Sequence, residues 1–81
     1  MPDLSDHLKA EVDRLCAEAD ELLDEDRYED ALARYASAWE LLPEPREDCA
    51  DAVWIQSGIG DAHFFQGDFA AARKAFMAVL R

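Results

Sequence analysis

Asp26-Arg-Tyr-Glu-Asp-Ala31 and Gly67-Asp-Phe-Ala-Ala-Ala72 are two versions of one sequence unit. In each unit a residue suited to a turn stands two positions before an aromatic residue and five positions before an alanine. A second aromatic residue, Tyr35 or Phe76, follows four positions after that alanine. Self-similarity at a fixed period is typical of solenoid proteins, which bind partners along an extended surface rather than in a convergent pocket.

The size and composition of the chain predict a single all-α domain. Its 81 residues suffice for one domain, and a chain this short buries only about 60% of its unfolded surface. With three glycines, three prolines and many alanines, the sequence favours helix throughout. We therefore expect one domain over residues 1–81, built from about four helices.

Three further features bear on where the protein works. No apolar run approaches the roughly 20 residues of a membrane-spanning helix. The first residues lack the basic and apolar regions of a secretory signal. Cys16 and Cys49 have no CxxC or Cys/His spacing, so reduced thiols are expected. We expect a cytoplasmic protein with no membrane partner.

Acidic charge is concentrated in the first two thirds of the chain. Residues 1–51 hold 17 acidic and 5 basic side chains, a net of −12, whereas residues 52–81 hold 2 and 3, a net of +1. Such a surplus repels phosphate groups and argues against binding of DNA or RNA. Solvated helix faces explain most surpluses of this kind, and the surplus also suits electrostatic steering of a basic partner.

Helix-capping and helix-breaking residues predict where the helices begin and end. The expected helix starts are Asp3 or Ser5, Tyr28, the residue after Pro45, and Phe69. The first helix should end in the acidic run at residues 24–26, because negative charge disfavours a helix C-terminus. The second should end near Leu42, before two prolines. Since the connections are short, neighbouring helices should be antiparallel and form two hairpins.

Apolar residues recur at spacings of three and four and mark a buried stripe on each helix. The packed residues expected in the first two helices are Leu4, Leu8, Val12, Leu15, Ala19, Leu22, Tyr28, Ala31, Leu32, Tyr35, Ala38, Trp39 and Leu42. Those expected in the last two helices are Cys49, Val53, Gln56, Ile59, Gly60, His63, Phe64, Phe69, Ala72, Phe76, Val79 and Leu80.

Two glycines have predicted roles. Gly60 lies in the middle of a helix, where glycine costs roughly 1 kcal/mol relative to alanine, so we expect another backbone to approach closely there. Gly67 is expected to be the left-handed C-cap of the third helix. Asp68 should then be the N-cap of the fourth.

Together these residues resemble two copies of the tetratricopeptide repeat, a helix-turn-helix unit. The second helix of that unit has an aromatic residue, an alanine, a large aromatic residue, a small residue and a proline in fixed register. The matching positions are Tyr28, Ala31, Tyr35, Ala38 and Pro43 in the first copy and Phe69, Ala72 and Phe76 in the second, where Val79 replaces the small residue. The small residue of the first helix is Ala19 in one copy and Gly60 in the other. The resemblance implies a right-handed α-α superhelix of tandem antiparallel hairpins.

The chain departs from this family in spacing and at its end. Ala31 and Ala72 are 41 residues apart, whereas the family repeats at about 34. We therefore expect repeat one at about 12–45, an extended helix start at 46–52, and repeat two at about 53–81. No further helix follows to cover the fourth one, so either the chain is a fragment of a longer repeat protein or another copy covers that face.

The resemblance also implies a binding surface, because the first helix of each pair lines the concave groove in this family. Carried over by position, the groove holds Asp13, Cys16, Asp20, Leu23, Trp54, Ser57, Asp61 and Phe64. Aromatic residues that a partner desolvates make binding hot spots, and flanking carboxylates favour lysine or arginine. The partner-binding residues expected are Asp13, Asp20, Trp54, Asp61 and Phe64, with packing into the core as the equal alternative for the two aromatic residues.

No pattern in the sequence indicates catalysis or a cofactor. His7 and His63 are the only histidines, and the sequence has no HExxH, phosphate-loop or nucleophile-elbow motif. The acidic run from Asp20 to Asp30 lacks the glycine and final glutamate of an EF-hand loop. We expect a non-enzyme without a metal or cofactor.

Three functions stay open on this reasoning. The leading one is an adaptor that binds a basic segment of another protein through the groove. The second is an acidic immunity or antitoxin protein that inhibits a basic toxin. The third is a structural element that forms homo-oligomers through the uncovered face of the fourth helix.

Overall fold

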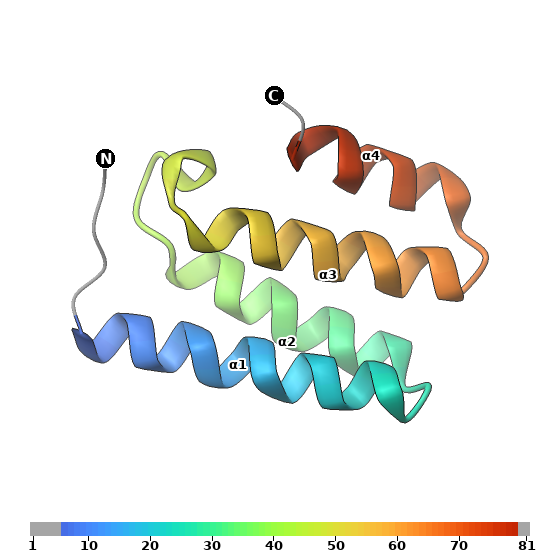
Figure 1. Ribbon diagram of the computed structural model, residues 1–81, viewed down its shortest axis with the longest axis horizontal. Coiled ribbons are helices and arrows are strands. Elements are labelled where there is room, and N and C mark those ends of the chain that lie inside the picture. The colour runs from blue at the N-terminus through green and yellow to red at the C-terminus, as the bar shows by residue number, and fades with distance from the viewer. Residues whose placement is uncertain (1–5, 80–81) are drawn as a thin grey trace.

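The computed structural model describes residues 6–79, apart from the side chains of Glu47 and Val79. Its helices are α1 (Asp6–Asp24), α2 (Tyr28–Leu41), the short 3-10 helix η1 (Arg46–Asp48), α3 (Asp51–Phe65) and α4 (Phe69–Val79), as Figure 1 shows. α1 packs on α2, α3 packs on α4, and α2 packs on α3. The predicted all-α fold of two helical hairpins is confirmed. The predicted positions Asp3, Leu4, Ser5 and Leu80 lie outside the described residues.

The two hairpin turns have the same backbone hydrogen bonds, 41 positions apart. In each turn two successive N–H groups bond back to the helix, one across five positions and one across three, as in a Schellman motif. In the first turn the Arg27 N–H donates to the Leu22 carbonyl (2.9 Å) and the Asp26 N–H to the Leu23 carbonyl (3.1 Å). In the second turn the Asp68 N–H donates to the His63 carbonyl (2.9 Å) and the Gly67 N–H to the Phe64 carbonyl (3.0 Å). Asp26 has a φ of 61° and Gly67 a φ of 85°. The left-handed C-cap role of Gly67 is confirmed.

Asp68 caps α4, as the sequence predicts. Its Oδ1 accepts a hydrogen bond from the Ala71 N–H at 3.2 Å, and its carbonyl accepts one from the Ala72 N–H at 3.0 Å. Arg27 stands in the equivalent place before α2, where its side chain makes no capping hydrogen bond. The two hairpins therefore share a backbone turn but differ in how their second helix is capped.

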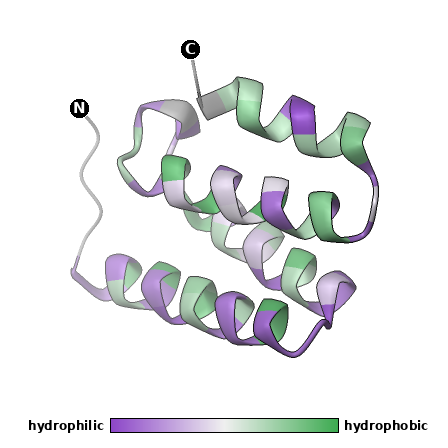
Figure 2. Cartoon of the chain, turned by 45° about the vertical axis from the view of Figure 1, so that its right-hand side comes forward, coloured by the Kyte–Doolittle hydropathy of each residue, from purple (hydrophilic) through white to green (hydrophobic). Residues whose placement is uncertain are grey.

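The core lies where α1, α2 and α3 meet. Its fully buried residues are Val12, Cys16, Ala19, Ala31, Tyr35, Ala38 and Ile55, with Leu42, Cys49 and Ala52 nearly so. Leu15 and Leu22 pack against this cluster but are only partly buried. Figure 2 shows both polar and apolar residues along α1, whereas α4 is mostly apolar with one polar band. The Cα radius of gyration of 12.2 Å is that of a compact chain of this length, roughly 12 Å.

Two aromatic rings lie over two glycines of α3. A Cβ atom added at Gly58 would meet the ring and hydroxyl of Tyr35, and one added at Gly60 would meet the ring of Phe76. In both cases the separation is closer than real Cβ atoms approach. The close neighbour expected at Gly60 is thus a side chain rather than a backbone. The role of Gly58 was not predicted.

The packed face predicted for α3 is partly wrong. Ala52, Ile55 and Ala62 are buried, whereas Val53 and Phe64 are each 53% exposed. α3 packs on α2 and also on α4, and apolar residues occur nearly all round it. Its sequence therefore does not single out one buried stripe, and small residues decide where neighbours approach.

A similar correction applies to α4. Ala72 and Ala75 form its buried side, and Phe76 lies over Gly60 while remaining 36% exposed. Phe69, which was expected to pack, is 62% exposed. The two small residues allow α4 to lie close to α3, so its larger side chains stand at the edge of the contact.

The connection between the hairpins does not extend α3, contrary to the expectation for residues 46–52. Arg46–Asp48 form a 3-10 helix, Cys49 is extended with ψ of 138°, and α3 begins at Asp51. The Arg46 Nε donates to the Trp39 carbonyl at 3.1 Å, which supplies a cation to the last turn of α2. Cys49 is 3% exposed, so this segment folds back over the core instead of adding two helical turns.

Candidate functional site

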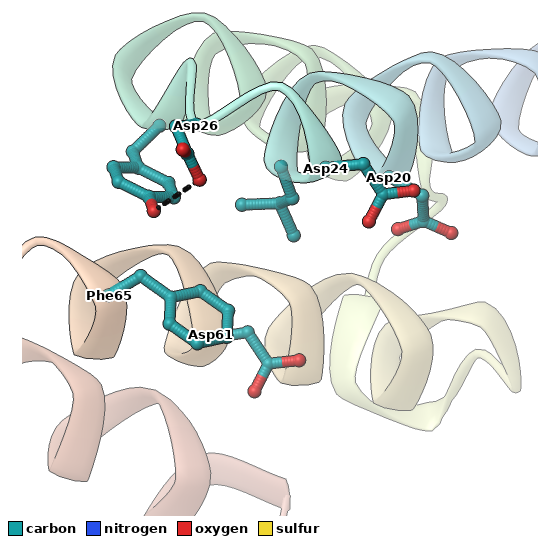
Figure 3. Close-up of a pocket in the computed structure, with 7 residues that line it drawn as sticks. Asp20, Asp24, Asp26, Asp61 and Phe65 are labelled. Carbon is teal, nitrogen blue, oxygen red and sulfur yellow. Dashed lines mark hydrogen bonds between the residues drawn. The ribbon is translucent and has the colours of Figure 1, made fainter.

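An open hollow lies beside the hairpin turns, between α1 and α3. It has a volume of about 440 Å³ and is lined by Asp20, Leu23, Asp24, Asp26, Tyr28, Asp61 and Phe65. Figure 3 shows Asp20 and Asp24 on α1 across from Asp61 and Phe65 on α3. Two residues that are 41 positions apart in sequence, Asp20 and Asp61, thus face the same space.

Carboxylates dominate the charge of this hollow. Four of its seven lining residues are aspartates, and none is lysine or arginine. The side chains of Asp24 and Asp61 make no hydrogen bond or ion pair within the described part of the chain. An uncompensated set of like charges in a concave surface concentrates the field and attracts cations.

Two tyrosine hydroxyls hold the remaining aspartates. Tyr35 donates from the core to the Asp20 Oδ1, and Tyr28 donates to the Asp26 Oδ1 at 2.9 Å. Burial, reinforced by the hydrogen bond to Asp20, raises the pKa of Tyr35 well above its ordinary value of 10.0. The hydrogen bond to Asp26 is the main cause of the raised pKa of Tyr28. Both hydroxyls therefore stay protonated at neutral pH and donate to carboxylates.

Four aromatic rings continue outward from the hollow. Tyr28 stacks on Phe65 with centroids 5.9 Å apart, Phe65 meets Phe64 at 6.0 Å, and Phe64 meets Phe69 at 5.4 Å. We call these four residues the ring chain. Its three phenylalanines are each more than half exposed, so rings and carboxylates are presented together at this end of the molecule.

The structure brings together only part of the predicted binding set. Asp20 and Asp61 line the hollow. Asp13 lies away from it and pairs with Lys9 at 3.0 Å, and Phe64 belongs to the ring chain. Trp54 is 39% exposed and does not line the hollow. Whether any of these residues binds a partner stays a prediction.

Cys16 does not belong to the groove to which it was assigned. It is completely buried, and burial, reinforced by nearby Asp20, raises the pKa of its thiol to about 12. Cys16 and Cys49 are both free. The Cys16 thiol is therefore neutral and inaccessible at physiological pH, and it is a core residue.

The sequence reasoning missed Asp24, Asp26, Tyr28 and Phe65 as parts of one surface. It assigned the acidic run to helix termination and Tyr28 to the core. Helical spacing could have found two of them, because Asp24 follows Asp20 and Phe65 follows Asp61 by four positions, on the same side of a helix. Asp26 and Tyr28 needed the geometry of the turn.

The described residues form neither a metal-binding cluster nor a membrane-spanning helix. Residues 6–79 contain no group of three or more His, Cys, Asp or Glu side chains that could hold a metal ion. Among the helices of this range, none has both the length and the apolar character needed to cross a membrane.

Comparison with known proteins gives the chain no family. No family model matches the sequence, and neither a curated protein nor a solved structure matches it significantly. The paired helices and the acidic hollow thus stand on the geometry of this chain alone.

Proposed function

We propose that the chain is a non-enzymatic protein-binding module of the tetratricopeptide type, whose acidic hollow holds a lysine or arginine of a partner protein. The observation that carries the proposal is the joining of four aspartates and two stacked rings in one open concavity. A cationic side chain is the ligand that suits both features, because carboxylates and aromatic faces each attract it.

The carboxylates supply attraction and orientation. Asp24 and Asp61 stand on opposite walls, on α1 and α3, so a guanidinium or ammonium group between them has acceptors on two sides. Asp20 keeps acceptor capacity beyond the single bond from Tyr35. Charge-assisted bonds of this kind are roughly twice as strong as neutral ones.

The rings supply the apolar part of the contact. Tyr28 and Phe65 form one wall of the hollow and continue into Phe64 and Phe69. The aliphatic stem of a lysine or arginine, or an apolar neighbour in the partner, has an exposed aromatic surface to cover there. We therefore propose a partner segment in which basic and apolar residues adjoin.

The repeat-like features favour a binding role over catalysis. The turn geometry recurs at 41 positions, in step with the sequence unit, and the family that the sequence resembles consists of binding modules. The neutral, buried Cys16 offers no nucleophile. An open acidic concavity beside paired helices matches recognition of an extended segment.

The test compares two variants with the same loss of charge. Asp24→Asn with Asp61→Asn removes two carboxylates from the hollow, and Asp6→Asn with Asp48→Asn removes two exposed ones elsewhere. Proteins captured by the native chain are purified, and their affinities for all three proteins are measured by calorimetry at several salt concentrations.

We expect the hollow variant to bind at least roughly tenfold more weakly, with a shallower salt dependence, because charge-assisted bonds contribute more than 1.4 kcal/mol each. The control variant should retain native affinity. Equal affinities for the hollow variant and the native chain would dispose of this assignment.

A further inference from the structure

The outward side of α4 is open and carries both apolar and basic side chains. Phe69 is 62% exposed, Met77 56% and Phe76 36%. A shallow hollow of about 600 Å³ on this side is lined by Ala70, Arg73, Lys74, Met77 and Ala78. In Figure 1, α4 forms the edge of the molecule, with only α3 beside it.

The first hairpin shows how such a side is covered. Tyr28 and Tyr35 stand 41 positions before Phe69 and Phe76. Tyr35 is fully buried against Gly58 of α3, and Tyr28 stacks on Phe65 of α3. What α2 has and α4 lacks, among the described residues, is a helix in the place of α3.

We propose that α1 of a second copy takes that place, so that copies of the chain stack head to tail, α4 on α1. α1 holds in the first hairpin the position that α3 holds in the second. Ala17 of α1 stands 41 positions before Gly58 and is exposed. A residue this small on the outward side of α1 lets a helix approach the ring of Phe76, as Gly58 does for Tyr35.

The register of the contact follows from the α2–α3 pair. Ala62 lies on α3 between Gly58 and Phe65, and therefore faces α2 between Tyr35 and Tyr28. The residue 41 positions before Ala62 is Glu21, which is exposed. In a stacked pair Glu21 consequently faces α4 between Phe76 and Phe69.

The charges of the two sides are complementary in this register. The stretch between Phe69 and Phe76 holds Arg73 and Lys74, and α4 contains no acidic residue. Neither cation makes an ion pair within the described residues. Glu21 likewise makes none there, so Glu21 of one copy and Arg73 of the next are each available to the other.

The contact is heterologous, because two different surfaces meet. Each stacked pair leaves one α1 and one α4 open, so the contact does not close after two copies, and further copies add as a ring or as an open series. This assembly goes beyond binding in the acidic hollow and does not use Asp61. Asp24 stands 41 positions before Phe65, so in this register it comes to lie beside Phe69 of the other copy.

The experiment is sedimentation of the 81-residue protein over a wide concentration range. The native chain should exceed the mass of a dimer as concentration rises, and salt should reduce that mass. Arg73→Glu and Glu21→Arg should each remain monomeric, since each places like charges across the contact. Circular dichroism checks that both variants stay folded.

Two combinations test the pairing itself. An equimolar mixture of Arg73→Glu and Glu21→Arg chains should stack again in alternation, and so should the chain that carries both changes. Glu29→Arg changes the charge equally on α2 and should leave stacking intact, as should Asp61→Asn in the acidic hollow. A monomeric native chain, a mass that stops at the dimer, or no recovery in the combinations overturns the proposal.

Discussion

Gly58 and Gly60 decide how closely α3 lies to its neighbours, because Tyr35 and Phe76 occupy the space where their side chains would be. Alanine normally stabilises a helix interior by roughly 1 kcal/mol relative to glycine. Overpacking a filled contact costs about 1–3 kcal/mol. Clash and propensity thus oppose each other at both positions, and the freedom of the ring determines the result.

We expect Gly58→Ala to lower the free energy of unfolding by about 2 kcal/mol and Gly60→Ala to lower it less. The Tyr35 ring is fully buried and its hydroxyl is fixed to Asp20, whereas the Phe76 ring is 36% exposed and can turn aside. Urea unfolding followed by circular dichroism measures both. A stabilised Gly58→Ala protein would mean that the Tyr35 contact is loose.

Tyr35 also gives the protein a predictable response to alkali. Its pKa is raised in the folded state, chiefly by burial, above the value of 10.0 expected when the chain is unfolded. The unfolded chain therefore loses this proton first as pH rises. The contribution of Tyr35 to the free energy of unfolding is therefore complete below about pH 10. It declines above that pH, because the unfolded chain then binds fewer protons than the folded one.

A Tyr28→Phe variant leaves Tyr35 as the only tyrosine, so tyrosinate absorbance then reports on one group. We expect this absorbance to appear together with the loss of helical circular dichroism as the pH is raised. Ionisation of Tyr35 in a protein that keeps its full helical signal would show that its hydroxyl is accessible to solvent.

Elements of the two hairpins differ most at the N-termini of α2 and α4. Asp68 caps α4 through the Ala71 N–H, while Arg27 makes no such bond before α2. Asp68→Ala should therefore reduce the free energy of unfolding by about 1 kcal/mol. Arg27→Ala should have a smaller effect, since it loses only exposed ion pairs with Glu25 and Asp30. Thermal unfolding of the two variants side by side makes the comparison, and equal losses would contradict it.

Helix ends could be predicted from the sequence where neighbouring residues alone determine them. The ends of α1 and α2, the left-handed Gly67 and the capping Asp68 all follow from capping and breaking rules that act within a few residues. Residues 46–50 did not follow such rules. Their path depends on burying Cys49 and on the bond from Arg46 to the Trp39 carbonyl, and both are tertiary contacts.

At the level of the whole molecule, the sequence predicted two hairpins because the spacing of Ala31, Tyr35, Ala72 and Phe76 recurs. It predicted Asp20 and Asp61 on a common surface through the family resemblance. It did not predict the surroundings of those two aspartates, because Tyr28 and Asp26 reach the hollow through the left-handed turn, and Phe65 through its pairing with Tyr28. Contacts between helices thus determine which residues surround these two aspartates, and local sequence patterns do not predict such contacts.

The ring chain ties the start of α2, the end of α3 and the start of α4 at one end of the molecule, where both hairpin turns also lie (Figure 1). The opposite end has the irregular segment around η1 and no comparable ring contacts among the described residues. Local opening should accordingly begin there and reach the turns last. Amide hydrogens near η1 would then exchange with deuterium faster than those near the two hairpin turns. The end of the molecule that holds the ring chain would be the more rigid one.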